Sequence, residues 1–272
     1  MSHHKKIALI GAGKMGEGLL GGILAQKKVL PDAVTIFDKV SARMGDLKKA
    51  YGINIAEDIP HILAEAEIVI LGVKPQDMGC LLAEIKPFFK ESILVVSIAA
   101  GVTTAFIESA LEGKARVIRM MPNMPALIGC GATALSKGEH ATDADIAAVL
   151  DLSDAIGLSV VVPEDLMDAV TGLSGCGPAY GFIMIEALAD AGVLMGLPRA
   201  ASQKLAAQTI LGAASLCLQG EAHPAALKDM IASPGGATIA GIKALEEGNF
   251  RASLIKAVEA ACVRSRSLLQ KG

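Results

Sequence analysis

Tryptophan is absent from this 272-residue chain, and all aromatic residues together make up only 3% of it. Charged residues are also sparse, at 19%, while hydrophobic residues reach 52%. Disordered chains have the opposite balance, so this composition predicts a folded protein packed mainly by Ala, Val, Leu and Ile. So low a charge content also indicates that another subunit covers much of the surface.

Basic clusters, long apolar runs and paired cysteines are missing as well. The net charge is −3, which argues against a nucleic-acid partner. Apolar runs such as ILVVSIAAGV are shorter than the roughly 18 residues that cross a bilayer, and the start of the chain shows no cleavable signal. The five cysteines are scattered, odd in number and without a CxxC pair, which favours reduced thiols. We therefore expect a cytoplasmic protein without a membrane partner and without a metal.

The two parts of the chain differ in their secondary-structure pattern. Residues 6–162 alternate amphipathic helices with short apolar runs, namely KIALI, AVTIFD, EIVILGV, SILVVSI, ARVIRMM and LSVVVP. This rhythm predicts a parallel, doubly wound sheet whose strands are buried on both faces. After Pro163 no strand run appears, and helices are predicted over 164–172, 176–196, 199–219, 223–231, 238–247 and 250–270. The fold class is therefore α/β, with a Rossmann-type dinucleotide-binding domain at 1–162 and an all-α domain at 163–272.

One predicted helix, AYGFIMIEALADAGVLMGL at residues 179–197, is apolar on nearly all sides. Such a helix is normally buried all round, which a small helical domain cannot achieve alone. We therefore expect a homodimer or a larger homo-oligomer, assembled through the helical domain.

A glycine-rich segment, IALIGAGKMGEG, follows the first predicted strand and opens a helix. Its glycines, Gly11, Gly13 and Gly16, have the GxGxxG spacing of dinucleotide-binding loops. Gly11 permits the tight turn, Gly13 lets the backbone approach a pyrophosphate, and Gly16 allows close packing of helix on strand. The amides of the helix N-terminus then face the phosphates. The loop residues Ala12, Lys14 and Met15 belong to the same predicted site.

The adenosine end of the cofactor is expected at Asp38, which ends the second predicted strand about 20 residues after Gly16. A carboxylate there binds ribose hydroxyls and repels a 2′-phosphate, although Lys39 and Arg43 are near enough in sequence to offset the repulsion. A solvated aspartate is the structural alternative. The choice between NADH and NADPH therefore stays open.

Further cofactor contacts are expected where other strands end, because ligands of open α/β sheets bind at the carboxyl ends of strands. Asn123 is a candidate for the nicotinamide ribose or carboxamide, although PNMP is also a favourable turn. Lys74 can equally be a surface lysine. The candidates are Val73, Lys74, Pro75, Ala99, Ala100, Met121 and Asn123.

Four motifs together resemble one family, the pyrroline-5-carboxylate reductases. They are GAGKMG, RMMPNMPALIGCG, TGLSGCGPAY and LKDMIASPGGATIAG, of which the last two are the most specific. The resemblance runs from about residue 6 to 270. It implies the last step of proline biosynthesis, in which NAD(P)H delivers a hydride to the C=N carbon of 1-pyrroline-5-carboxylate to give L-proline. It also implies interlocked helical domains, with each active site drawing on two chains.

This chain departs from the family pattern at three positions. Cys176 replaces the usual Ser, and a cysteine thiol is a weaker hydrogen-bond partner than a serine hydroxyl. Asp38 stands where NADPH-dependent members often carry a small polar residue, and Ile59 stands where many have Asn. The resemblance thus favours NADPH, whereas Asp38 leaves NADH open.

The implied substrate needs its carboxylate clamped and a hydrogen-bonding group at its ring nitrogen. The segment SPGGAT is a predicted helix N-terminus, where free amides attract anions. Gly235 lets the backbone approach, the amides of Gly236, Ala237 and Thr238 converge on the carboxylate, and Ser233 is an extra donor. The Thr238 hydroxyl is the catalytic candidate at the nitrogen, with plain helix capping as the alternative.

Weaker substrate-binding candidates complete the pocket. Glu164 and Glu221 can face the ring nitrogen or a nearby water, or lie on a helix surface. Ser174 and Gly175 are expected in the pocket wall.

Two alternatives come from other classes of protein. A β-hydroxyacid-dehydrogenase-like enzyme would resemble this architecture but carry a catalytic Lys on the first long helix of the second domain, where GCGPAYGFIMIEALADAG has none. A nucleotide-sensing or structural protein would not need an intact SPGGAT segment. A reductase of other cyclic imines also stays open.

Overall fold

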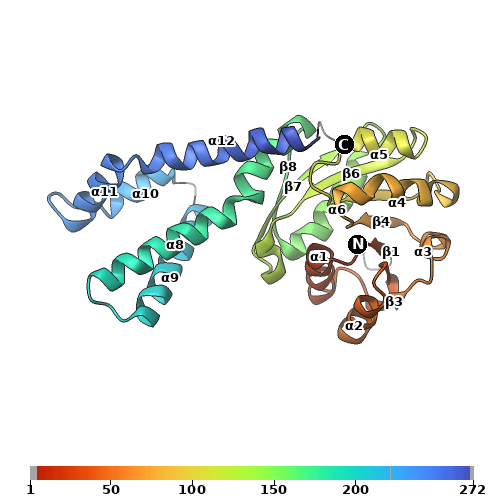
Figure 1. Cartoon of the computed structure of the whole chain (residues 1–272), viewed down its shortest axis with the longest axis horizontal. Coiled ribbons are helices and arrows are strands. Elements are labelled where there is room, and N and C mark those ends of the chain that lie inside the picture. The colour runs from red at the N-terminus through yellow and green to blue at the C-terminus, as the bar shows by residue number, and fades with distance from the viewer. Residues whose placement is uncertain (1–4, 221, 270–272) are drawn as a thin grey trace. The chain divides into compact units, whose positions relative to one another are not determined.

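The structure, a computed structural model, describes residues 5–220 and 222–269. By contacts the chain separates into two compact units (Figure 1). The second unit is Cys176–Ala260, and the first contains the described residues up to Gly175 together with those from Ala261 onward. Residues 163–175 therefore pack with the strands, although they follow the last strand in the chain.

The described part of the first unit contains one eight-stranded sheet, in the order β3-β2-β1-β4-β5-β6-β7-β8. Neighbouring strands are parallel except β6 and β7, which are antiparallel. All six predicted strand runs form strands, while β3 and β7 were not predicted. The strands are β1 (Ile7–Ile10), β2 (Val34–Phe37), β3 (Asn54–Ile55), β4 (Ile68–Leu71), β5 (Leu94–Ser97), β6 (Arg116–Met121), β7 (Gly131–Lys137) and β8 (Gly157–Val161).

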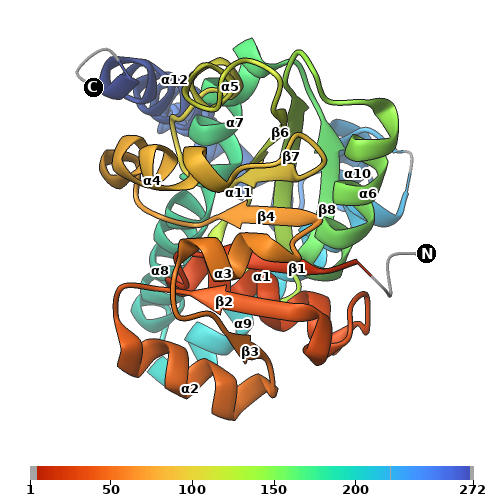
Figure 2. The same cartoon turned by 90° about the vertical axis from the view of Figure 1, so that its right-hand side faces the viewer.

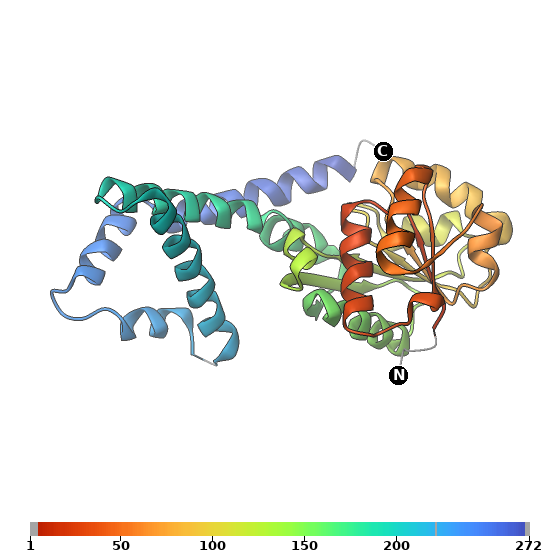
Figure 3. The ribbon, with the colours of Figure 1, turned by 90° about the horizontal axis from the view of Figure 1, so that it is seen from below.

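Helices cover both faces of this sheet (Figures 2 and 3). One apolar cluster joins the strands to α1 (Lys14–Ala25), α2 (Ser41–Tyr51) and α6 (Asp143–Ser153). A second cluster joins the other face to α3 (Ile59–Ala64), α4 (Met78–Ile85) and α5 (Thr104–Ala110). Because side chains alternate along a strand, β1 sends Ile7 and Leu9 to the first cluster and Ala8 and Ile10 to the second. The buried, doubly covered strands confirm the predicted α/β class.

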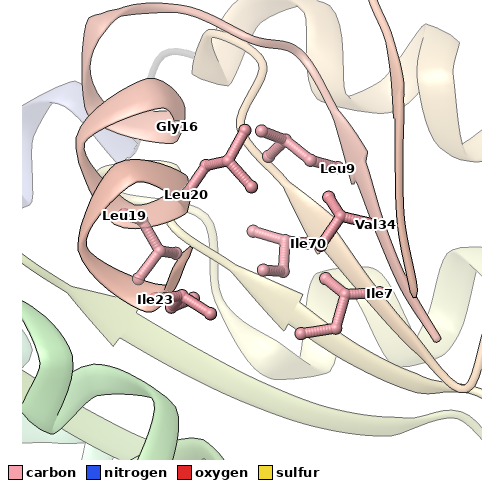
Figure 4. A pocket seen from close by; sticks show the side chains of 8 residues that line it. All are labelled: Ile7, Leu9, Gly16, Leu19, Leu20, Ile23, Val34 and Ile70. Carbon is pink, nitrogen blue, oxygen red and sulfur yellow. The ribbon is translucent and has the colours of Figure 1, made fainter. Parts of the chain in front are cut away.

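The contact of α1 with the sheet is core and not a ligand site (Figure 4). The void there measures about 10 Å³ and is lined by apolar side chains and one glycine, namely Ile7, Leu9, Gly16, Leu19, Leu20, Ile23, Val34 and Ile70. An apolar space of that size is at the lower limit for one water molecule and stays dry. A Cβ at Gly16 would lie 2.9 Å from the Gly11 carbonyl oxygen, so a larger residue would push α1 off the sheet.

The helices predicted after residue 175 all form. They are α8 (Gly177–Leu194), α9 (Arg199–Gln219), α10 (Pro224–Met230), α11 (Ala237–Glu247) and α12 (Phe250–Leu269). The stretch predicted as one helix over 164–172 is instead a 3₁₀ turn, η6 (Glu164–Leu166), a short helix, α7 (Met167–Val170), and a π-helical turn, η7 (Thr171–Gly175). Within the second unit, α8 and α9 pack tightly, and the Ser202 hydroxyl donates to the Ala189 carbonyl at 2.6 Å.

The α8 helix keeps most of its apolar side chains exposed in the single chain. Ile183 is 64% exposed and Leu194 80% exposed, and Ala189 is the buried residue of this helix. By length and composition alone, the stretch Glu164–Leu194 could also cross a membrane, although one such stretch is weak evidence. The all-round burial predicted for this helix thus requires something beyond one copy of the chain.

Candidate active site

The glycine loop between β1 and α1 begins at a position that only glycine tolerates. Gly11 has φ of +89°, and a Cβ there would lie 2.6 Å from the Val73 backbone nitrogen. Its own N–H donates to the Phe37 carbonyl at 2.9 Å. The loop is therefore fixed between the ends of β2 and β4 before any ligand arrives.

Gly13 differs from its two neighbours in the motif, because a Cβ built on it meets nothing within 4 Å. It is the N-cap residue of α1, which has no side-chain cap. The first amides of α1 therefore have no side-chain cap, and no side chain at Gly13 stands in front of them, as an anion-binding helix N-terminus requires. This arrangement fits a dinucleotide pyrophosphate, and the exposed Lys14 lies beside it.

Asp38 braces this loop. Its Oδ2 accepts the Ala12 N–H at 2.7 Å, and its Oδ1 accepts the Val40 N–H at 2.9 Å. Arg43, in α2, also contacts Ala12: its Nε donates to the Ala12 carbonyl at 3.0 Å, and its guanidinium is paired with Glu17. Each Asp38 oxygen keeps a lone pair for a ribose hydroxyl. A carboxylate and a guanidinium thus flank the point where the adenosine ribose is expected.

Other candidates lie at the same edge of the sheet. Since β1, β4, β5 and β6 run parallel and in register, the residues that follow them meet there. Lys74, Pro75 and Ala100 are exposed, whereas Ala99 is buried. The structure therefore brings the cofactor candidates Val73, Lys74, Pro75, Ala99, Ala100 and Met121 together with the glycine loop, and Lys39 is exposed beyond β2.

Asn123, predicted as a cofactor contact, is buried and links three segments. Its Nδ2 donates to the Ser174 carbonyl at 2.9 Å, and its Oδ1 accepts the Ala132 N–H at 2.9 Å. One N–H of the side-chain amide remains for a cofactor. The side chain thereby fastens the end of β6 to β7 and to the π-helical turn.

Glu164, a candidate for the ring nitrogen, lies in a partly buried charge cluster that sequence reasoning missed. The Glu164 carboxylate accepts the Thr104 N–H at 2.8 Å and the Thr104 hydroxyl at 2.5 Å. Arg119, from the middle of β6, donates to it at 3.2 Å. The signal in the sequence was Arg119, the second arginine of the run ARVIRMM, because a charge in the middle of a buried strand needs a partner.

The SPGGAT segment, in the second unit, ends in the predicted helix N-terminus. Gly235 has φ of +68°, and Gly236 is the N-cap residue of α11, which has no side-chain cap. A Cβ at Gly236 would lie 2.3 Å from the Ser233 hydroxyl. One expectation is wrong: the Gly236 N–H is not free, because it donates to the Ser233 carbonyl at 3.1 Å and closes the turn. The amides of Ala237 and Thr238 begin the helix.

Thr238 is the second residue of α11, is exposed, and does not cap the helix. The capping alternative for Thr238 therefore falls, and within the described part of the chain its hydroxyl has no protein partner. Glu221, the other candidate for the ring nitrogen, lies outside the described residues.

Cys176 and Tyr180 are one turn apart at the start of α8. Burial raises the pKa of the Tyr180 phenol, and the neighbouring Cys176 thiol raises that pKa further. The phenol donates to the Ala257 carbonyl at 3.3 Å. The cysteine thus lies beside a tyrosine that ties α8 to α12 within the second unit.

Two family models match the chain. Residues 164–268 match one described as pyrroline-5-carboxylate reductase dimerisation. Residues 6–101 match one described as NADP oxidoreductase, coenzyme F420-dependent. The dimerisation match begins at residue 164, directly after the last strand of the sheet.

Similar proteins match along nearly the whole chain. The pyrroline-5-carboxylate reductase of Methanosarcina acetivorans is 44% identical over 98% of this chain and 99% of its own length. That of Escherichia coli K12 is 42% identical over 97% and 98%. Among solved structures, a pyrroline-5-carboxylate reductase from Coxiella burnetii has a TM-score of 0.93 at 34% identity, covering 98% of this chain and 99% of that one. The Plasmodium falciparum enzyme with NADP bound has a TM-score of 0.86 at 32% identity, covering 99% of each.

Proposed function

The chain belongs to the pyrroline-5-carboxylate reductase family, and we propose that it reduces the C=N bond of 1-pyrroline-5-carboxylate with NAD(P)H to give L-proline. The observation that carries this proposal is similarity to pyrroline-5-carboxylate reductases along 98% of the chain, together with the uncapped glycine N-termini of α1 and α11. This activity is the last step of proline biosynthesis. The five free cysteines support a cytoplasmic location.

The cofactor is proposed to lie along the carboxyl edge of the sheet. The α1 amides around Gly13 bind the pyrophosphate, Asp38 and Lys39 face the adenosine ribose, and the ends of β4, β5 and β6 flank the nicotinamide. The nicotinamide supplies the hydride when it is bound. The protein's part is to hold that ring and to exclude water.

The substrate is proposed to bind at the start of α11. The amides of Ala237 and Thr238 bind its carboxylate, Gly235 lets the backbone approach, and the Ser233 hydroxyl adds a donor. The Thr238 hydroxyl is placed at the ring nitrogen, where it can donate to the developing amine or accept from the protonated imine. Ser174 and Gly175 form the wall of the pocket.

The helical domain is proposed to form a homodimer or a larger homo-oligomer. The match of residues 164–268 to a dimerisation family supports a second copy over a membrane as the cover of the exposed apolar side chains of α8. Burial of side chains such as Ile183 contributes about 1.5–3 kcal/mol each.

The test is a spectrophotometric assay of NADPH and NADH oxidation with 1-pyrroline-5-carboxylate, with proline identified as the product. A six-membered cyclic imine and a β-hydroxyacid with NAD(P)⁺ serve as comparison substrates. We expect turnover of the five-membered imine with both cofactors and no oxidation of the hydroxyacid. A folded, cofactor-binding protein that prefers either comparison substrate would overturn the proposal.

A further inference from the structure

We propose that Glu164 is a positioning residue for this reaction: through Thr104 and Arg119 it fixes the π-helical turn Thr171–Gly175 against the carboxyl end of β6. The inference rests on the proposed function, since the turn carries the proposed pocket wall. All the residues involved lie in the first unit, so the contacts are internal to it.

The cluster joins segments that are far apart in sequence. Glu164 opens η6, Thr104 is the first residue of α5, and Arg119 lies in β6. Three hydrogen bonds, of 2.8, 2.5 and 3.2 Å, occupy both carboxylate oxygens of Glu164. The carboxylate also faces the N-terminus of α5, which favours negative charge. Glu164 is therefore held in one place by three donors.

This arrangement is costly as a device for stability alone. Arg119 is only 4% exposed, and its Nη2 is buried without a hydrogen-bond partner in the described structure. Glu108, one turn along α5 from Thr104, also has a buried carboxylate oxygen without a partner there. Desolvating such groups costs free energy that apolar residues of similar size would avoid. The charged cluster fixes the backbone in a definite position, which an apolar cluster would not do.

A second connection fastens the other end of the same stretch. The Asn123 amide donates to the Ser174 carbonyl at 2.9 Å, and a Cβ on Gly175 would lie 3.0 Å from the Met121 methyl. Between Glu164 and Ser174 the chain forms α7 and the π-helical turn, a rare geometry that recurs at functional sites. Two side-chain connections thus hold this connector at the end of β6.

The consequence for the reaction follows from distance. Displacing a positioning group by about 1 Å can lower a rate by about a hundredfold, because the reacting atoms leave their productive alignment. Ser174 and Gly175 lie at the end of the connector that Glu164 anchors. Loosening that anchor should therefore affect the imine more than the cofactor, whose glycine loop is built separately on β1, β2 and β4.

The experiment compares Glu164→Gln, Thr104→Val and Thr104→Ser with a matched control, Asp145→Asn. Thr104→Val removes only the hydroxyl, and Thr104→Ser restores it. Asp145 pairs at 2.7 Å with Arg116, which is the first residue of β6 and so lies at the end of the strand away from the proposed site. Steady-state kinetics, cofactor binding, thermal unfolding and hydrogen exchange of residues 171–175 are measured on the full-length proteins.

We expect Glu164→Gln to raise KM for the imine and lower kcat/KM by roughly tenfold or more, with the dissociation constant for NADPH within about twofold of wild type. Thr104→Val should show a smaller change in the same direction, and Thr104→Ser should recover wild-type values. Exchange at 171–175 should accelerate in Glu164→Gln. Asp145→Asn should lower the melting temperature without changing KM or the exchange of that turn.

An unchanged imine KM with wild-type exchange at 171–175 in Glu164→Gln would overturn the inference. So would equal kinetic effects of Glu164→Gln and Asp145→Asn. If Glu164→Gln does not fold, Thr104→Val and Thr104→Ser decide alone, because Val keeps the shape of the side chain without its hydroxyl and Ser keeps the hydroxyl. A wild-type protein without activity on the imine would instead refute the proposed function. The hydrogen exchange of residues 171–175 would still show whether Glu164 fixes the π-helical turn.

Discussion

Replacing Asp38 by Asn should move the cofactor preference toward NADPH. Asp38 and Arg43 both contact Ala12, the first on its N–H and the second on its carbonyl, so opposite charges flank the expected ribose. The Asn oxygen can still accept the Ala12 N–H, so the contact with the glycine loop is kept, while the negative charge and the contact with the Val40 N–H are lost. The substitution thus removes the charge and keeps the contact that braces the loop.

The magnitude follows from the repulsion between a carboxylate and a 2′-phosphate. Two unit charges about 4 Å apart interact by about 1 kcal/mol in water and by about 4 kcal/mol near a protein surface. Asp38 is half-buried, and Arg43 is already partly neutralised by Glu17, so the guanidinium offsets only part of this repulsion. We expect a net change of about 1.4–2.8 kcal/mol, which is roughly 10–100-fold in the ratio of kcat/KM for NADPH over NADH.

The assay measures kcat/KM with both cofactors at saturating imine and constant ionic strength, since exposed charges are screened by salt. Arg43→Met should move the ratio the opposite way, and Glu17→Gln should move it toward NADPH by freeing the guanidinium. Asp46→Asn, an exposed residue of α2, removes the same charge as a control. A ratio that changes less than about twofold in Asp38→Asn, or equally in Asp46→Asn, would refute the placement of the ribose beside Asp38.

Three further predictions concern the glycine loop, the catalytic candidate and the start of α8. Thr238→Ala should lower kcat/KM for the imine by roughly 10–100-fold with NADPH affinity nearly unchanged, because the hydroxyl has no structural partner; wild-type kinetics would remove Thr238 from the chemistry. Gly13→Ala should weaken cofactor binding in titration calorimetry while leaving the melting temperature close to wild type. Gly11→Ala should lower the melting temperature, because of the two glycines only Gly11 has a positive φ and a crowded Cβ position. Equal melting temperatures of the two variants would contradict this assignment. Cys176→Ser should lower the pKa of Tyr180 toward the ordinary value, because the thiol contributes to raising it. The chain has two tyrosines and no tryptophan, so an ultraviolet titration in a Tyr51→Phe background isolates the Tyr180 phenol. An unmoved pKa would leave burial as the only cause of the shift.

The strands that could be predicted from the sequence are those with continuous apolar runs. Both missed strands lack such a run, for different reasons. The β3 strand contains only Asn54 and Ile55, too few for any pattern. The β7 strand, GATALSK, is built from small and polar residues and pairs antiparallel with β6, which departs from the fully parallel sheet that was predicted. Small side chains fit β7 because its Gly131 packs directly against Ala126 and the Ile156 carbonyl.

The Glu164 cluster lay beyond sequence reasoning because its members are separated by tens of residues. Nothing local indicates that Thr104, at the start of one helix, meets Glu164 after the last strand. A helical pattern over 164–172 was a fair expectation, but the π-helical turn depends on the Asn123 contact with Ser174, which only the folded chain provides. Contacts of this kind arise from tertiary structure and leave no periodic signature.

The two proposed binding segments were predictable for the opposite reason. Both α1 and α11 begin at a glycine N-cap, Gly13 and Gly236, without a side-chain cap. In α5 and α6, by contrast, Thr103 and Thr142 cap the helix by accepting a backbone N–H. A glycine in that place forgoes about 1 kcal/mol or less of capping free energy and leaves amides for another acceptor. An anion that takes the place of the cap recovers that free energy only when it binds, so a phosphate at α1 and a carboxylate at α11 would each complete a helix end that begins at a glycine.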